Sequence, residues 1–386
     1  MRIVHLVPNL NFGGLQKVVR MLAISQRQAG HDVTVCCWTH ASNNPDAEKE
    51  LETAGVQIVY AQRAANGGTC HNRLTLFRKL KGLLGAGRAD ILHVHNPFGY
   101  YIYGVLTARA AGRTKVVNTI HLTAMFDHPR FGGKGRVKFR AAAALTDRIV
   151  TVCDEDNAYL QRRFGVRPRK LCVIENGIEP STFLTVPARN RRHEIVFGFA
   201  GRMAPEKNHR VLIDAFAMAR LKHGNIRLRL LGGGPLEDQI KEQARDLGLG
   251  DSVEFCGFSN DVAGFLGSLD IYVLPSDFEA LPLSLLEAIA SGLPVVATRV
   301  GGVPKIVRTT DSGWLCDPGN AESLKAAMEL AIDSPERRER GERARRAVAE
   351  FYSADRMAGD YERLYLELSR PQGNSIRSKR HLVESA

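Results

Sequence analysis

Short apolar runs alternate with helical patterns along most of this sequence, and this alternation limits the possible folds. Strand-like runs at 2–8, 31–38, 89–96 and 115–121 are separated by segments such as 13–30, whose apolar residues recur at helical spacing. Parallel strands need long crossover connections, which are usually helices. The pattern therefore predicts an α/β fold in which helices cover both faces of parallel sheets.

The chain is long enough for two such domains. Its 386 residues exceed the ~150 expected of one domain, and the alternation is interrupted at 180–194 by a proline-containing, charged segment. We predict a Rossmann-like domain at 1–180 and a second at 181–354. We further predict a helix at 355–369 that packs back on the first domain, and a disordered tail at 371–386. Ligands of doubly wound sheets bind beyond the strand carboxyl ends, so the site is expected in a cleft between the domains.

Positive charge is concentrated in the first half. Residues 1–180 hold 25 lysines and arginines against 13 aspartates and glutamates, whereas 181–386 hold 28 of each. Dense basic stretches occur at 130–140 and 162–170. This asymmetry indicates an anionic partner such as a phosphorylated small molecule, a phospholipid surface or nucleic acid, or else a solvated basic face without a partner.

The cysteines and the apolar runs bear on location. The 7 cysteines form no CxxC pair and fall mostly in strand-like runs, as expected of reduced thiols in a cytoplasmic protein. The first residues do not resemble a signal peptide, and no run reaches the ~18 apolar residues of a membrane span. We expect a cytoplasmic protein that is soluble or peripheral to a membrane.

The stretch DFEALPLSLLEAIASGLPVVAT, residues 277–298, combines a helix start with two carboxylates. Pro282 suits a first helical turn, so the free amides of Leu281 and Leu283 predict an anion site at a sheet edge. Glu279 and Glu287 flank this site, where carboxylates would accept hydrogen bonds from sugar hydroxyls. Together they suggest a nucleotide-sugar. The alternative is a solvated loop glutamate and a helix-dipole partner.

Two cations follow a strand at GRMAPEKN, residues 201–208. Arg202 and Lys207 would leave the strand on a tight loop, with Asn208 capping the next helix. A guanidinium and an ammonium there could neutralise a diphosphate and stabilise it as it departs. The alternative is a pair of surface cations.

Other stretches carry weaker signals. The pair Gly13-Gly14 lets backbone approach a ligand, and His121 ends a strand where it could contact a sugar or a phosphate. The segment LLGGGPLED has Glu237 where a dinucleotide fingerprint needs glycine, which argues against a nicotinamide cofactor. The acidic run 154–156 resembles a metal-binding DxD motif, but we interpret it as a helix cap and predict no metal site.

Together these motifs resemble the retaining GT-B glycosyltransferases of family four. The resemblance rests on seven stretches: HLVPNLNFGG, ENGIEP, FAGRMAPEKN, LLGGGPLED, VEFCGF, DIYVLPSDFEALPLSLLEAIASGLPVVAT and VGGVPKIV. It implies two Rossmann-like domains that face each other across a cleft, and no metal or other cofactor.

The resemblance also implies residue roles. Arg202 and Lys207 would hold the donor diphosphate, and Glu279 would bind the hydroxyls of the donor sugar. Further implied contacts are the ribose at Glu287, the phosphate at Gly13, Gly14, Leu281 and Leu283, the sugar at His121, the base at Gly257 and Phe258, and substrate at Asn176. Family members commonly have glutamate where this chain has Gln16, which weakens expectations about acceptor contacts there.

The implied reaction moves a hexose from a UDP- or GDP-sugar to an acceptor with retained anomeric configuration. The resemblance implies that the basic first domain binds the acceptor, and its charge suggests a lipid-linked or anionic acceptor at the inner membrane face. We expect a lipid-linked, polysaccharide or other glycan acceptor, in cell-envelope or exopolysaccharide synthesis. Two other activities on this fold stay open, a nucleotide-sugar 2-epimerase and a sugar-phosphate synthase. A non-catalytic module that binds sugar nucleotides or nucleic acid is the remaining alternative, and a nucleic-acid partner is not expected.

Overall fold

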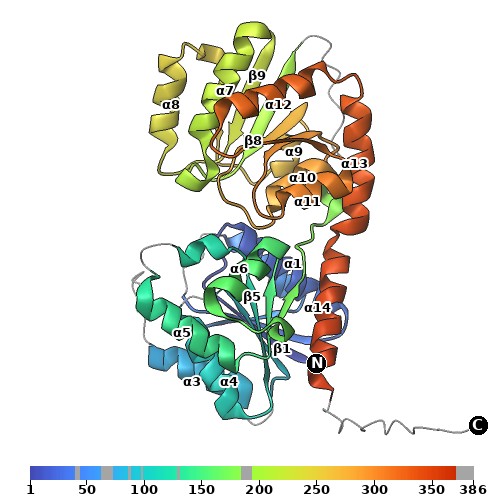
Figure 1. Cartoon of the computed structure of the whole chain (residues 1–386). Coiled ribbons are helices and arrows are strands. Elements are labelled where there is room, and N and C mark those ends of the chain that lie inside the picture. Colours follow the sequence, from blue (N-terminus) through green and yellow to red (C-terminus); the bar gives the residue numbers. More distant parts are fainter. Residues whose placement is uncertain are drawn as a thin grey trace, which may run out of the picture.

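Two parallel sheets organise the protein, one in each half of the chain (Figure 1). The computed structural model describes residues 1–39, 44–61, 73–85, 88–96, 99–127, 131–183 and 194–370. The predicted fold class, a pair of doubly wound α/β domains, is confirmed. The predicted tail at 371–386 and most of the predicted linker at 180–194 lie outside the described residues, and the boundary at 180 stays a prediction.

The first sheet has seven strands in the order β3-β2-β1-β4-β5-β6-β7, all parallel. Chain order reverses between β1 and β4, the position where doubly wound sheets open a crevice for ligands. Its strands are β1 (Arg2–Val7), β2 (Asp32–Cys37), β3 (Gln57–Tyr60), β4 (Ile91–His95), β5 (Lys115–Ile120), β6 (Arg148–Thr151) and β7 (Leu171–Val173). Its helices are α1 (Gly14–Gln28), α2 (Pro45–Thr53), α3 (Arg73–Leu84), α4 (Tyr100–Ala111), α5 (Gly132–Leu145) and α6 (Asp154–Phe164).

The second sheet has six parallel strands in the order β10-β9-β8-β11-β12-β13. The order reverses between β8 and β11. Its strands are β8 (Ile195–Ala200), β9 (Ile226–Leu231), β10 (Val253–Gly257), β11 (Ile271–Leu274), β12 (Val295–Thr298) and β13 (Gly313–Cys316). Its helices are α7 (His209–Lys222), α8 (Glu237–Asp246), α9 (Val262–Leu266), α10 (Leu283–Ala290), α11 (Val303–Thr310) and α12 (Ala321–Asp333).

Two final helices run from the second domain back to the first. Helix α13 (Arg337–Phe351) lies beside the second domain, and α14 (Ala354–Ser369) continues alongside the first (Figure 1). Between them the chain pairs with Ile178, whose amide donates to Tyr352 and whose carbonyl accepts from Ala354. A Cβ at Gly177 would lie 2.2 Å from the Ser353 carbonyl oxygen, so glycine permits this crossing.

Helix α13 was not predicted from the sequence. Its buried face consists of Gly341, Ala344 and Val348, and charged residues occupy most of its other positions. Helical periodicity is hard to detect when the apolar stripe is this narrow and its residues this small. Among the described residues, no helix combines the length and apolar character needed to cross a lipid bilayer.

Candidate active site between the two domains

A cleft of about 610 Å³ lies between the carboxyl ends of the two sheets. Both domains contribute to its walls, and every predicted site residue except Gly257 is part of the lining. From the first domain these are Gly13, Gly14, His121 and Asn176, and from the second Arg202, Lys207, Phe258, Glu279, Leu281, Leu283 and Glu287. Residues more than 250 positions apart in the sequence thus meet at one site.

Lys207 and Glu279 form an ion pair on the second-domain side of this cleft. Lys207 Nζ donates to Glu279 Oε1 at 2.6 Å, and Ser276 Oγ donates to the same oxygen at 2.7 Å. Only 24% of the lysine side chain and 9% of the glutamate side chain are exposed. The low exposure strengthens the attraction and holds both groups in a defined position.

The loop that carries Lys207 is itself held rigidly. Asn208 adopts a left-handed conformation, and its side chain caps α7 by accepting from the Val211 amide at 3.4 Å. The other end of the Asn208 amide donates to Asp277 Oδ1 at 2.8 Å, which ties this loop to the one that carries Glu279. The predicted cap is confirmed.

Arg202 lies on the same loop but has a different environment. Its side chain is exposed and makes no ion pair with any residue that the structure describes. A guanidinium without a protein partner in a cleft is available to a ligand, and its geometry suits bidentate binding of phosphate oxygens.

The start of helix α10 provides amide donors. Pro282 is its N-cap rather than its first helical residue, which corrects the predicted helix start by one position. The following amides have no intrahelical acceptor, and they face the cleft near the first domain. An added Cβ on Gly14 would lie 3.9 Å from Leu283 Cδ1, so Gly14 brings the first domain into contact with this helix end.

Glu287 is held across the cleft by Lys17 of helix α1, a contact that sequence reasoning missed. Lys17 Nζ donates to Glu287 Oε1, and the ammonium also lies 5.6 Å from the centre of the Phe183 ring. Only 7% of the Glu287 side chain is exposed. A carboxylate that is buried at a cleft wall needs a donor, and Lys17 supplies it.

Asn176 and the aromatic residues at the cleft mouth also join the domains. Asn176 is buried, and its side-chain amide donates to the Leu281 carbonyl oxygen at 3.0 Å, so in this structure it positions the start of α10. Phe258, predicted beside the base, is 63% exposed and meets Phe12 of the first domain edge-on at 4.8 Å. Gly257 lies behind it and accepts from the Gly232 amide at 2.7 Å.

His121 contributes a neutral imidazole to the first-domain wall. Its backbone amide donates to Asn96 Oδ1 at 2.9 Å, and its Nε2 lies 3.1 Å from His95 Nδ1. Burial lowers the pKa of His121 to about 4, which leaves the ring uncharged near neutral pH.

Behind His121 lies a group of buried histidines that we did not anticipate. His5, His93 and His95 present ring nitrogens within 4.8 Å of one another. We refer to these three residues together with His121 as the histidine cluster. The alternation of His93 and His95 along one strand was a visible signal, but their approach to His5 depends on strand order.

The acidic run at 154–156 serves structural contacts. Cys153 is the N-cap of α6, so the three acidic residues form the first turn rather than the predicted cap. Asp156 accepts from both the amide and the hydroxyl of Thr123, and burial raises its pKa to about 6. Asp154 pairs with Lys305 at 3.4 Å across the domains.

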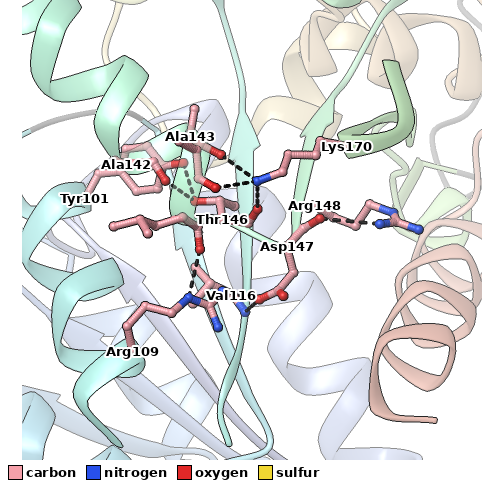
Figure 2. Close-up of polar contacts among 11 residues, drawn as sticks. Tyr101, Arg109, Val116, Ala142, Ala143, Thr146, Asp147, Arg148 and Lys170 are labelled. Carbon is pink, nitrogen blue, oxygen red and sulfur yellow. Dashed lines mark hydrogen bonds and ion pairs between the residues drawn. The ribbon is translucent and has the colours of Figure 1, made fainter. Parts of the chain in front are cut away.

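A second hollow, of about 580 Å³, is lined by residues of the first domain and the end of α14, and includes Arg169 and Lys170 of the basic stretch 162–170. Figure 2 shows the polar contacts of Lys170 and Arg109 at this position. Lys170 Nζ donates to three carbonyl oxygens at the end of α5, at 2.6 to 3.2 Å. Arg109 pairs with Asp147. These cations are bonded to the chain itself, so they support the fold at this position.

Comparisons with known proteins agree with the two-domain arrangement. One family model, described as Glycosyltransferase Family 4, matches residues 12–182, and a second, Glycosyl transferases group 1, matches residues 186–347. Together the two matches span most of the chain. The protein belongs to the GT-B glycosyltransferases of family 4, and it is a transferase.

Individual relatives are distant. The chain is 27% identical over 314 residues to an N-acetyl-alpha-D-glucosaminyl L-malate synthase of Bacillus anthracis, covering 78% of this chain and 81% of that protein. It is 29% identical over 288 residues to a UDP-Gal:alpha-D-GlcNAc-diphosphoundecaprenol alpha-1,3-galactosyltransferase of Escherichia coli, covering 68% and 73%. The solved structure of Anabaena HepE in complex with UDP superposes with a TM-score of 0.78 at 20% identity, covering 95% and 100%.

Proposed function

We propose that this protein transfers a hexose from a nucleoside diphosphate sugar to an acceptor hydroxyl, with retention of the anomeric configuration. The observation that carries the proposal is the cleft arrangement of Lys207, Glu279 and Arg202 beside the free amides of α10. The names of the HepE complex with UDP and of the galactosyltransferase relative favour UDP as the nucleotide, with GDP the alternative.

The diphosphate would bind where positive charge and amide donors converge. Arg202 has no ion pair among the described residues, and Lys207 can share its three N–H groups between Glu279 and a phosphate oxygen. The first amides of α10 add their partial positive charge. These groups stabilise the diphosphate as negative charge develops on it, which is the task a metal ion performs in other transferases.

The two glutamates would bind the hydroxyls at either end of the donor. Glu279 already accepts from Lys207 and Ser276 at one oxygen, which leaves its other oxygen for the donor sugar. Glu287, buried beside the start of α10, would accept from the nucleotide ribose while sharing its charge with Lys17.

In the transfer step, the acceptor oxygen forms a bond to the anomeric carbon on the face from which the diphosphate leaves. The bond between that carbon and the diphosphate oxygen breaks, and the acceptor proton passes to the departing phosphate oxygen. Glu279 is bonded to Lys207 and Ser276, and Glu287 to Lys17. Both carboxylates are assigned to bind donor hydroxyls, so neither is assigned the role of a covalent nucleophile. His121, neutral and at the cleft wall, would contact the transferred sugar.

The acceptor is proposed to be lipid-linked or a glycan, reached from an anionic membrane surface at the cytoplasmic face. Helix α5 exposes Lys134, Lys138 and Arg140 beside Val137, which is 68% exposed. A helix with exposed basic and apolar residues binds anionic headgroups through both contributions. Sedimentation with anionic and neutral lipid vesicles at low and high salt tests this proposal. Binding that does not depend on lipid charge or on salt would contradict it.

The central experiment incubates the protein with radiolabelled UDP- and GDP-sugars and measures slow donor hydrolysis without acceptor. We expect one donor to be hydrolysed, and we expect this activity to disappear in Lys207→Ala. NMR of the first-formed product with an added acceptor then reports the anomeric configuration. Absence of turnover with every donor, or product of inverted configuration, would contradict the proposal.

A further inference from the structure

A continuous line of hydrogen bonds joins the cleft to the interior of the first domain. His121 Nε2 lies 3.1 Å from His95 Nδ1, and His95 Nε2 lies 3.1 Å from His5 Nδ1. The line ends at helix α1, where His5 Nε2 lies 2.7 Å from the side-chain oxygen of Gln26. His5, His95 and Gln26 are all buried.

Sheet register explains why the histidines meet. His5 of β1 is the direct partner of His93 of β4. His95 follows two positions later and therefore points to the same face. Helices α1 and α14 pack against each other over this part of the sheet and supply Gln26 and Tyr365 to the same network. The residues form one polar layer between the sheet and these helices.

The direction of the hydrogen bonds must be uniform along the line. Burial lowers the pKa of His5 to about 4 and holds that of His95 well below its ordinary value, so both rings are neutral. A neutral imidazole has one N–H and one bare nitrogen. Each ring therefore donates at one end and accepts at the other, and the tautomer of one ring determines that of the next.

The Gln26 amide determines which direction is adopted. Its oxygen can only accept, so His5 carries its proton on Nε2. The nitrogen end of the same amide lies 3.5 Å from the Tyr365 hydroxyl, which lies 2.6 Å from His93 Nδ1. With His5 Nδ1 bare, His95 donates from Nε2, and its own bare Nδ1 then accepts from His121 Nε2. The remaining nitrogen of His121, Nδ1, is bare and has no partner among the residues that the structure describes.

We propose that Gln26, His5 and His95 are positioning residues that hold His121 as the Nε2–H tautomer, so that its bare Nδ1 accepts a hydrogen bond from a sugar hydroxyl in the cleft. The sugar contact rests on the proposed function, whereas the tautomer is a property of the free protein. We refer to the line from Gln26 through His5 and His95 to His121 as the relay. Through it, buried residues of the first domain determine whether the cleft wall donates or accepts a hydrogen bond at His121.

A metal ion held by the buried histidines is the competing explanation. His5, His93 and His95 have the required proximity. However, His93 Nε2 lies 2.7 Å from Thr119 Oγ1, and its Nδ1 faces the Tyr365 hydroxyl. Both nitrogens of His5 and of His95 are also engaged, so three free lone pairs do not converge on one point.

The test measures histidine tautomers in the ¹⁵N-labelled free protein by long-range ¹H–¹⁵N NMR. We expect His121 to be the Nε2–H form in the wild type. In Gln26→Leu the buried His5 Nε2 loses its acceptor, so its proton should move to Nδ1 and reverse every bond in the line. His121, three hydrogen bonds away, should then become the Nδ1–H form. Gln26→Glu is the matched control, because a carboxyl oxygen still accepts and the wild-type tautomer should persist.

His95→Phe gives an independent test that keeps a ring at this position. Its apolar ring cannot accept from His121 Nε2, so His121 should again become the Nδ1–H form. An unchanged His121 tautomer in either folded variant overturns the relay, and so does a stoichiometric metal ion in the purified protein whose removal shifts the histidine resonances.

Activity then tests the sugar contact separately. We expect kcat/KM for sugar transfer to fall about tenfold in Gln26→Leu and to recover in Gln26→Glu, since one hydrogen bond is worth about this factor. If the tautomer reverses while kcat/KM is unchanged, the contact between His121 and the sugar is wrong although the relay stands. If the wild type transfers no sugar at all, the proposed function fails, and the tautomer result is unaffected.

Discussion

The two walls of the cleft satisfy their buried polar side chains in different ways. On the second-domain side, charge is paired with charge, as in Lys207 with Glu279 and Glu287 with Lys17. On the first-domain side, the histidine cluster is kept neutral, and its rings bond to one another. The ion pairs provide charges that a ligand can share. The neutral histidines instead provide a hydrogen-bond donor at one ring nitrogen and an acceptor at the other.

This difference matches the two ends of the proposed substrate. A diphosphate that gains negative charge needs cations that are already positioned near it. A transferred sugar presents hydroxyl groups, each of which is both donor and acceptor, and a neutral ring of fixed tautomer can select one of these modes. The comparison predicts that acid should damage the first wall, and that loss of single charges should damage the second.

The largest effect expected is loss of stability in mild acid. Burial lowers the pKa of His5, His121 and His209 from 6.5 to about 4. Between these values the unfolded chain binds more protons than the folded one, so the free energy of unfolding should fall as pH drops from 6.5 toward 4. At pH 5 each such histidine costs roughly 2 kcal/mol. Urea unfolding at pH 7, 6 and 5 measures this, and equal stability at all three contradicts it.

His209→Phe provides a matched control for this acid sensitivity. Both ring nitrogens of His209 are buried without a hydrogen-bond partner among the described residues, and the ring packs edge-on against Phe199 at 4.9 Å. A phenyl ring fits this environment without the desolvation penalty. We expect the variant to be more stable than the wild type by about 1 kcal/mol at pH 7. Between pH 7 and pH 5 its free energy of unfolding should fall less than that of the wild type, by the contribution of one histidine.

Removal of one charge from the second wall should act on catalysis instead. Lys207→Met is expected to lower kcat/KM by about 10³, because it removes a positioned cation from the departing diphosphate. Initial rates with the preferred donor measure this. Lys222→Met, at the C-terminal end of α7, the helix that follows Lys207, lies 3.7 Å from Glu329 and should stay within about twofold of the wild type. Equal losses in both variants would argue that the effect is structural.

The sequence predicted some residues of the cleft well and missed other contacts. His121 directly follows strand β5, whereas Arg202 and Lys207 lie in the loop after β8 and Glu279 in the loop after β11. Parallel topology brings the carboxyl ends of strands to one edge. Their convergence could therefore be predicted once the β-α alternation was recognised. The approach of Gly14 to the phosphate from the first domain was implied by the family resemblance instead.

The contacts that were missed depend on the order of strands in the sheet and on how the domains face each other, and a local sequence pattern predicts neither. His5 meets His93 because β1 lies beside β4, although two strands separate them in the chain. Lys17 reaches Glu287 because of how the domains face each other, which no local pattern encodes. Helix α13 was not predicted because its buried face is narrow and made of small residues.

Glu287→Gln should weaken nucleotide binding with little effect on the chemical step. A neutral amide oxygen accepts a ribose hydroxyl less strongly than a carboxylate, so the Kd for UDP should rise about tenfold while kcat changes less than threefold. Calorimetry with UDP and 2′-deoxy-UDP sharpens the assignment. Loss of the 2′-hydroxyl should weaken binding to the wild type but hardly affect the variant, and equal losses in both proteins would remove Glu287 from the ribose.

The smallest effect is expected at the ion pair that crosses the cleft. Lys17→Met leaves Glu287 buried without its donor, and we expect the free energy of unfolding to fall by about 1 kcal/mol. Saturating UDP should restore most of this loss, because ribose hydroxyls then donate to the same carboxylate. Thermal unfolding with and without UDP measures both values.

A second ion pair between the domains is the natural control for Lys17. Lys305 pairs with Glu175 at 3.1 Å away from the cleft lining, and 48% of the lysine side chain is exposed. Lys305→Met should cost less than about 0.5 kcal/mol, and UDP should leave that difference unchanged. In a Glu287→Gln background the Lys17→Met penalty should largely vanish, since no buried charge is then left unpaired. If UDP rescued Lys305→Met equally, the nucleotide would be acting on domain contact in general rather than on Glu287.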